Sequence, residues 1–197
     1  MKDLIKDSLT KSTSYTTFRN LVRDLLENGK STGPNQSDAL LNYSMLNDKR
    51  MARLDKKIKL SETTIERLNN VKKAQTWLLI TEGWCGDAAH ILPVMNKMSA
   101  ENENINLKVI LRDENPELIN QFLTNGSMSI PKLVVLDTND KVVSSWGPRP
   151  SIASKMVVDY KEKHGGLDSD FKKDLQLWYN KNKGVNIQED LLAFLEK

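Results

Sequence analysis

The run from Trp77 to His90 constrains the fold more than any other part of the sequence. It begins with Trp77-Leu78-Leu79-Ile80, four consecutive apolar residues of the kind expected in a strand buried on both faces. After Gly83-Trp84-Cys85-Gly86, apolar residues recur at helical spacing to about residue 99. Pro93 falls inside this helix, and we expect it to kink the helix. With a second strand predicted at residues 106–111, strand, helix and strand form a parallel βαβ unit.

The next part of the chain predicts a short helix followed by a β-hairpin. Asn115-Pro116-Glu117 places a cap residue, a proline and an acid in order, which marks a helix start. We expect this helix to end near Asn125-Gly126. Two β-rich runs, residues 132–137 and 141–146, then flank the short polar connection 138–140. This arrangement favours an antiparallel hairpin.

Both ends of the chain are predicted to be helical. Near the N-terminus, Asn28-Gly29 supplies a helix stop, and Ser37 and Ser61 are candidate helix caps. The helix that starts at Ser37 is expected to have a polar gap at Asn47 in a stripe formed by Leu40, Tyr43, Met51, Leu54 and Ile58. After residue 150, three stripes predict three further helices: Ile152, Met156 and Tyr160; Phe171, Leu175 and Trp178; Ile187, Leu191 and Leu195.

Composition narrows the class of protein. The single cysteine among 197 residues cannot form an internal disulfide, so we expect a reducing, cytoplasmic location. The first residues carry charges where a secretory leader needs its apolar region, and no apolar run approaches membrane-spanning length.

The basic residues are concentrated in the N-terminal part of the chain. Residues 1–75 hold 15 of the 29 basic residues but only 9 of the 26 acidic ones. The densest basic run, within residues 49–59, is interpreted as the solvated face of a helix rather than as a nucleic-acid or acidic-partner site.

The order of elements and four short motifs resemble the thioredoxin family. The motifs are Gly83-Trp84-Cys85-Gly86, Asp113-Glu114-Asn115-Pro116, Ser129-Ile130-Pro131 and the final amphipathic helix. The resemblance covers about residues 76–147 and 186–197. It implies an α/β thioredoxin-like fold with a central mixed sheet of about four strands. Residues 1–75 would then be a helical N-terminal extension, and 76–197 a thioredoxin-like domain with a helical insert at about 151–185.

With Gly147-Pro148-Arg149-Pro150, the sequence is most similar to bacterial thioredoxin-like proteins that carry such helical additions. It departs from the family at the residues that perform dithiol chemistry. The family uses a second cysteine to resolve a mixed disulfide, and Ala88 stands at that position. Leu79 replaces the usual buried aspartate, and the associated lysine aligns with Val109. Reduction of a disulfide by one molecule acting alone is therefore excluded.

Cys85 is the candidate catalytic residue. At a helix N-terminus it would face unpaired N–H groups and the positive end of the helix dipole, which favour the thiolate. Asp87 opposes the thiolate by charge repulsion, and the two effects are of similar size, so their sum has no predicted sign. We expect Cys85 to be partly exposed at the end of its strand rather than buried as a structural residue, with Lys132 as a nearby cation that offsets Asp87.

The predicted substrate-binding residues surround Cys85: Trp84, Gly86, Asp87, Ile130 and Pro131. The resemblance implies that Pro131 is a cis-proline and that the Ile130 backbone pairs with an extended substrate; equally, the fold alone would retain that proline. Trp84 would either face a partner or pack against the sheet edge. His90 lies about 140° around the helix from Cys85, at roughly 100° per residue, so a Cys–His pair is not expected.

Two functional hypotheses follow, with a third as a minor alternative. The first is a monothiol redox protein in which Cys85 attacks mixed disulfides of protein thiols and an external, low-molecular-weight thiol resolves the product. The second is a non-catalytic thioredoxin-fold module that binds a protein partner. The third, an iron–sulfur scaffold, has only the Cys85-Gly86 pair in its favour. We expect no metal, because Cys85, His90 and His164 do not make a recognisable ligand set, and no other cofactor, nucleic acid or membrane partner.

Overall fold

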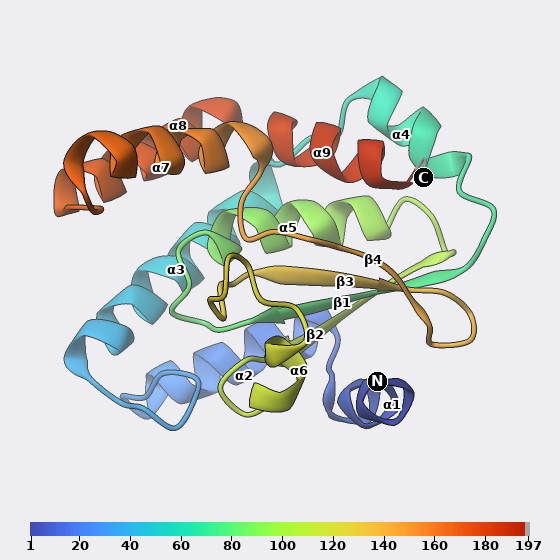
Figure 1. The fold of residues 1–197 in the computed structure, drawn as a ribbon, viewed down its shortest axis with the longest axis horizontal. Helices are drawn as coiled ribbons and strands as arrows, with labels where there is room; N and C mark the ends of the chain where they lie inside the picture. Colours follow the sequence, from blue (N-terminus) through green and yellow to red (C-terminus); the bar gives the residue numbers. More distant parts are fainter. Residues whose placement is uncertain (196–197) are drawn as a thin grey trace.

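A mixed four-stranded sheet forms the centre of the computed structural model, which describes residues 1–195 (Figure 1). Its strands lie in the order β2-β1-β3-β4. β1 pairs in parallel with β2, whereas β3 pairs antiparallel with both β1 and β4. The bounds are β1 (Gln75–Thr81), β2 (Ile105–Leu111), β3 (Lys132–Leu136) and β4 (Val142–Trp146). The predicted thioredoxin-like sheet is therefore confirmed, including the parallel βαβ unit and the hairpin.

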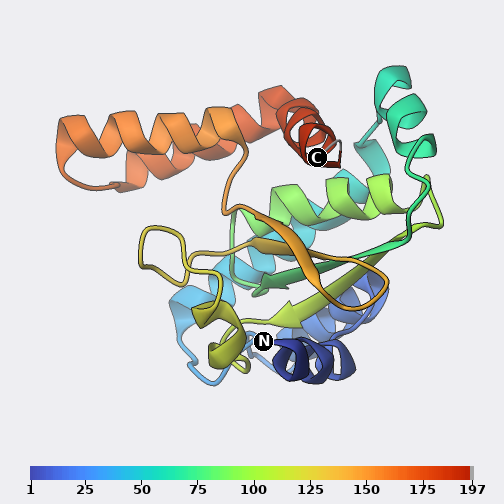
Figure 2. The same cartoon turned by 45° about the vertical axis from the view of Figure 1, so that its right-hand side comes forward.

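Helices cover both faces of this sheet. Their bounds are α1 (Lys2–Lys11), α2 (Tyr15–Glu27), α3 (Asp38–Lys57), α4 (Glu62–Asn69), α5 (Ala88–Ser99), α6 (Pro116–Asn120), α7 (Ser151–His164), α8 (Ser169–Asn182) and α9 (Val185–Leu195). Figures 1 and 2 show α5 and α9 on one face of the sheet and α1 and α6 on the other. In both views α7 and α8 lie side by side and extend past the sheet.

β1 is apolar along its length because both of its faces are covered. Trp77 and Leu79 belong to the core cluster beneath α5 and α9. Leu78 and Ile80 belong to a second cluster that contains residues of α1 and α6. All four side chains are fully buried, as the continuous apolar run predicted.

The N-terminal helices are joined to the sheet and to one another by specific bonds. Thr13 exchanges two backbone hydrogen bonds of 2.8 Å with Val109 at the outer side of β2. The side chains of Ser37 and Ser61 accept hydrogen bonds from Leu40 N–H and Thr64 N–H, so both predicted caps are confirmed. The boundary at residue 75 between an extension and a domain stays a prediction, as do the limits of the insert. Residues 196–197 of the predicted last segment lie outside the described residues.

The Asn125-Gly126 prediction was wrong. α6 ends at Asn120, and Asn125 and Gly126 have φ of 50° and 75°. Thr124 and Ser127 exchange two backbone hydrogen bonds across this pair. Asn-Gly therefore makes a two-residue turn between paired residues, a geometry for which positive φ at both positions is suited.

Two stripe positions were also assigned to the wrong side of their helices. Tyr43 is 52% exposed and Ile152 is 47% exposed. In α3 the buried positions are Ser44, Asn47 and Met51, because the first half of its inner face makes polar contacts through Ser44 and Asn47. In α7, Ala153 and Val157 are buried in place of Ile152. In α8, Trp178 packs against the core as its stripe predicted, and the neighbouring Tyr179 is buried as well.

A glycine between α8 and α9 fixes how this part of the chain packs on α5. Gly184 has φ of +81°, and a Cβ at this position would lie 2.7 Å from Val94 Cγ2. Gly165, after α7, has a similar φ of +75°, but a Cβ there would meet nothing within 4 Å. The two positions therefore share backbone strain and differ in steric contact.

We expect Gly184→Ala to lower the free energy of unfolding by about 2–4 kcal/mol, since it adds a clash to the backbone cost. The control Gly165→Ala should lose only about 1 kcal/mol. Urea unfolding of both variants at one pH measures the difference. Equal losses would contradict the packing of Gly184 against Val94.

Candidate active site around Cys85

Cys85 lies in the loop that joins β1 to α5, and it is buried. Its side chain belongs to the core cluster that includes Ala88 and Ile130, and the residue is 7% exposed. The thiol donates a hydrogen bond to the carbonyl oxygen of Ile130 at 3.5 Å. The Ile130–Pro131 peptide bond is cis. The expectation that Cys85 is partly exposed was wrong, because neighbouring segments close over the strand end.

Burial determines the protonation state of this thiol. Burial, together with the smaller effect of the Asp87 charge, raises the pKa of Cys85 to about 12. The backbone N–H groups of Ala88 and Asp87 and the charge of Arg149 oppose this rise in pKa. The sequence left open whether the helix terminus or Asp87 would determine the Cys85 pKa, and the largest effect is a third one, desolvation of the thiol. In this structure Cys85 is a protonated thiol.

Asp87 makes the main polar contacts beside Cys85. Its Oδ2 atom lies 2.7 Å from Nη2 of Arg149, and its Oδ1 atom accepts a hydrogen bond of 2.9 Å from the Tyr179 hydroxyl. The carboxylate does not cap α5. Burial raises the pKa of Asp87, although Arg149 and Tyr179 both favour the ionised form. We call these three residues the Asp87 cluster; they come from the start of α5, the loop after β4, and α8.

α8 covers the site through two further contacts. The Gln176 side chain lies 3.0 Å from Nε2 of His90, and the rings of His90 and Tyr179 stack with centroids 4.5 Å apart. A Cβ at Gly86 would lie 3.6 Å from the Gln176 amide nitrogen, so α8 lies directly over the Cys85-Gly86 turn. His90 therefore turns toward α8, and burial lowers its pKa to about 3. Among residues 1–195, no bond joins His90 to Cys85.

The N-terminal helices hold the other side of the same turn. Gly83 donates its N–H to Thr32 Oγ1 at 2.9 Å, and its carbonyl accepts from Asn47 Nδ2 at 3.0 Å. A Cβ at Gly83 would lie 3.2 Å from Val22. Glu82 is buried and accepts the Asp113 N–H, and burial raises the pKa of Glu82. Segments far apart in the sequence thus fix the backbone that leads into Cys85.

Neither Trp84 nor Lys132 makes a polar contact with Cys85 or Asp87 among the described residues. Trp84 is half-buried, with the Arg112 guanidinium 4.8 Å from its ring centre. Lys132 is buried, and its Nζ donates to Thr124 Oγ1 at 2.6 Å. The cation that lowers the Cys85 pKa is Arg149 rather than Lys132. The expectation that Lys132 offsets Asp87 was therefore wrong.

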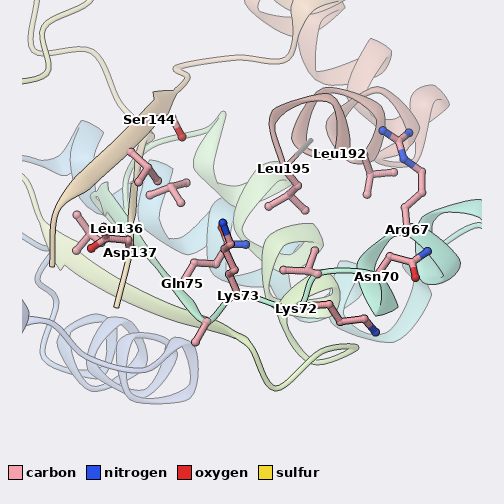
Figure 3. A pocket seen from close by; sticks show the side chains of 14 residues that line it. Arg67, Asn70, Lys72, Lys73, Gln75, Leu136, Asp137, Ser144, Leu192 and Leu195 are labelled. Carbon is pink, nitrogen blue, oxygen red and sulfur yellow. The ribbon is translucent and has the colours of Figure 1, made fainter. Parts of the chain in front are cut away.

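One pocket of the protein lies away from Cys85, at the other end of β1. A pocket of about 690 Å³ opens at the far end of β1, between Gln75, Asp137 and Leu192 (Figure 3). It therefore lies at the opposite end of the strand from Cys85.

Within residues 1–195, no three His, Cys, Asp or Glu side chains gather as a metal site. No helix in that range is both long and apolar enough to cross a membrane.

Comparison with known proteins agrees with this architecture. A family model described as thioredoxin matches residues 33–163. The chain belongs to the thioredoxin family. Thioredoxin from Bacillus subtilis (strain 168) is 34% identical over 77 residues, which are 39% of this chain and 71% of that protein. The thioredoxin match starts before α3 and ends within α7, so it includes α3 and excludes α8.

Two solved structures share the fold over nearly their whole length. One is a protein of unknown function from Pseudomonas aeruginosa, with a TM-score of 0.60 and 20% identity over 93% of this chain and 98% of that one. The other is an HIV epitope scaffold, with a TM-score of 0.59 and the same identity and coverage. At this identity the likeness concerns the fold alone. Membership of the thioredoxin family points to a redox-type function, and that family generally acts on protein thiols.

The predicted site residues divide into two groups in this thioredoxin-like structure. Cys85, Asp87, Ile130 and Pro131 come together, as their motif positions implied. Arg149, Tyr179 and Gln176 were not predicted as site residues, although they make the nearest polar contacts. Arg149 belongs to a motif that the sequence made visible, Gly147-Pro148-Arg149-Pro150. No spacing pattern in the sequence connects Tyr179 or Gln176 to Cys85.

The electrostatic account of the Cys85 thiol predicts the effect of neutralising Asp87. Asp87→Asn removes a negative charge beside the thiol and leaves Arg149 without its carboxylate, and both changes lower the Cys85 pKa. We expect alkylation by iodoacetamide at pH 8 to accelerate about tenfold, the equivalent of one pKa unit. The pH dependence of the rate, followed by mass spectrometry, measures this shift.

Asp140→Asn, in the β3–β4 turn, is the matched control and should alkylate at the wild-type rate. An unchanged or slower rate in Asp87→Asn would contradict the proposed effect of the Asp87 charge on the thiol.

Proposed function

We propose that this protein is a monothiol redox protein in which Cys85 exchanges with mixed disulfides between protein thiols and a small thiol. The observation that supports this proposal is the position of Cys85. It stands at the start of α5 against the Ile130 carbonyl, beside a cis-proline, while Ala88 occupies the place of a second cysteine. One attacking thiol is sufficient for exchange, provided that an outside thiol completes it.

The reaction consists of two balanced exchanges. The Cys85 thiolate attacks the small-thiol sulfur of the mixed disulfide, the original S–S bond breaks, and the protein sulfur leaves with the electron pair and takes up a proton. Cys85 now holds the small thiol as a disulfide. A second small-thiol molecule, as its thiolate, attacks that disulfide and releases Cys85. The target thiol is restored, and the small thiol it carried leaves joined to the second one as their disulfide, so one free small-thiol molecule is consumed in each cycle.

The burial of Cys85 adds a requirement to this cycle. Gln176 and Tyr179 must move from the Gly86 side before a disulfide can reach the sulfur. The Ile130 N–H donates to no acceptor among residues 1–195, so it is free to pair with an extended segment of a target. Because resolution requires an external thiol, we place the activity in the reducing cytoplasm of a bacterium.

The test uses a peptide whose single cysteine is glutathionylated, incubated with the protein and analysed by mass spectrometry. We expect glutathione to move to Cys85 and to be released on addition of reduced glutathione. Cys85→Ser should accept none. Ala88→Cys restores a second thiol and should not accumulate the adduct, because the introduced thiol resolves it. Absence of transfer to the wild-type protein, or equal modification of Cys85→Ser, would overturn the proposal.

A second candidate function is supported by the burial of Cys85 and by its pKa of about 12. In this alternative the protein binds partners along the Ile130–Pro131 segment, and Cys85 serves only to fill the core. A native protein that takes up no glutathione, but whose Cys85 reacts fully after unfolding in urea, would favour this function over the redox one.

A further inference from the structure

Two carboxylates of α3 form ion pairs with arginines of α2 rather than with the arginines of α3. Asp48 lies 2.7 Å from Arg19 and 3.4 Å from Arg23, and Asp55 lies 2.6 Å from Arg19. These carboxylates are therefore engaged by α2. Neither Arg50 nor Arg53 has a carboxylate within ion-pair distance among residues 1–195. Their side chains bond instead to neutral amides.

Arg50 lies next to the Cys85 turn. Its Nη1 donates to Asn47 Oδ1 at 2.6 Å, and the other end of the Asn47 amide holds the carbonyl of Gly83. Arg50 is half-buried, and burial lowers its pKa, with the nearby charge of Arg53 acting in the same direction. The charge of Asp87 acts in the opposite direction on Arg50, but Asp87 forms its ion pair with Arg149, so two guanidinium groups at the edge of the site repel each other without an ion pair of their own.

Arg53 extends this positive region to the helix that covers the site. Its Nη2 donates to Asn180 Oδ1 of α8 at 2.6 Å, and Gln176, also on α8, contacts His90. The α8 side chains in these contacts are uncharged amides, so they do not neutralise the arginines.

The same side of α3 carries further exposed cations. Positions 49, 53 and 56, and positions 50, 53 and 57, share one side of an α-helix. We call this set the α3 basic stripe; its residues are Lys49, Arg50, Arg53, Lys56 and Lys57. The stripe runs along α3, and Arg50 is the member tied through Asn47 to the Cys85 turn.

We propose that the α3 basic stripe, which the sequence alone favoured as a solvated helix face, binds an acidic segment beside the target cysteine of a protein substrate. This inference rests on the proposed function, because it names the class of protein thiol that would reach Cys85. Arginine forks bind carboxylates in a bidentate manner, and unpaired cations at a site attract anionic partners over a distance. A ligand that brings a mixed disulfide to Cys85 is a polypeptide, which favours an acidic protein segment over a nucleic acid as the partner of the stripe.

The test compares two glutathionylated peptides that differ only in their flanks, three glutamates in one and three glutamines in the other. At low ionic strength we expect transfer to Cys85 to be about tenfold faster from the acidic peptide. This advantage should shrink as salt is added. Arg50→Gln/Arg53→Gln should remove it, and Arg53→Gln alone, at an exposed position, should reduce it without affecting the fold.

Lys2→Gln/Lys6→Gln, which changes two exposed cations of α1, is the matched control and should keep the full advantage. Equal rates from the two peptides with the wild-type protein would overturn the inference while leaving the proposed function intact.

Binding of the same peptides to Cys85→Ser, followed by fluorescence anisotropy, separates the surface from the chemistry. Preferential binding of the acidic peptide that depends on Arg50 and Arg53 supports the inference even if no transfer occurs with the wild-type protein. Tighter binding of a single-stranded RNA of equal charge would overturn it in favour of a nucleic-acid surface.

Discussion

The ion pair between Asp87 and Arg149, with the Tyr179 hydroxyl as a third partner, joins three segments that the chain brings together from different regions. Asp87 opens α5, Arg149 follows β4, and Tyr179 lies on α8. Removing one partner from a buried ion pair typically costs about 3–5 kcal/mol, since the other charge is left without compensation. The position of α8 over the Cys85 turn therefore depends on this small cluster as well as on apolar packing.

The same cluster explains why a family position that usually favours a thiolate here favours a thiol. The helix terminus still directs N–H groups at Cys85, and Arg149 still lies near it. However, Arg149 forms its ion pair with Asp87, so its positive charge stabilises the Cys85 thiolate only weakly. In addition, α8 excludes the water that would stabilise the thiolate. Reactivity at Cys85 is consequently linked to the conformation of α8, which lies outside the thioredoxin match.

The sequence was sufficient to predict features that depend on local pattern. The four apolar residues of β1, the serine caps of α3 and α4 and the hairpin at residues 138–140 each follow from neighbours in the chain. Asn125-Gly126 was misread because the same dipeptide ends helices and forms two-residue turns, and only the pairing of Thr124 with Ser127 distinguishes the two. Ambiguity of this kind is inherent to short turn signals.

The burial of Cys85 by α8 and the N-terminal helices could not be predicted, because it depends on contacts between residues far apart in the sequence. Tyr179 contacts Asp87 from 92 positions away, and Asn47 contacts Gly83 from 36 positions away. Such contacts leave no periodic trace in the sequence, and the burial of Cys85 follows from them. The partial exposure expected from its strand-end position was reasonable for the core fold but ignored the helices added to it.

The most direct test of this account is the pKa of Cys85 in the folded wild-type protein, measured by NMR titration of its ¹³C-labelled Cβ. A closed site predicts a thiol that remains protonated through pH 9, in line with a pKa of about 12. A pKa below 7 would contradict it, because the thiol would then be solvated or paired with a cation in the resting protein.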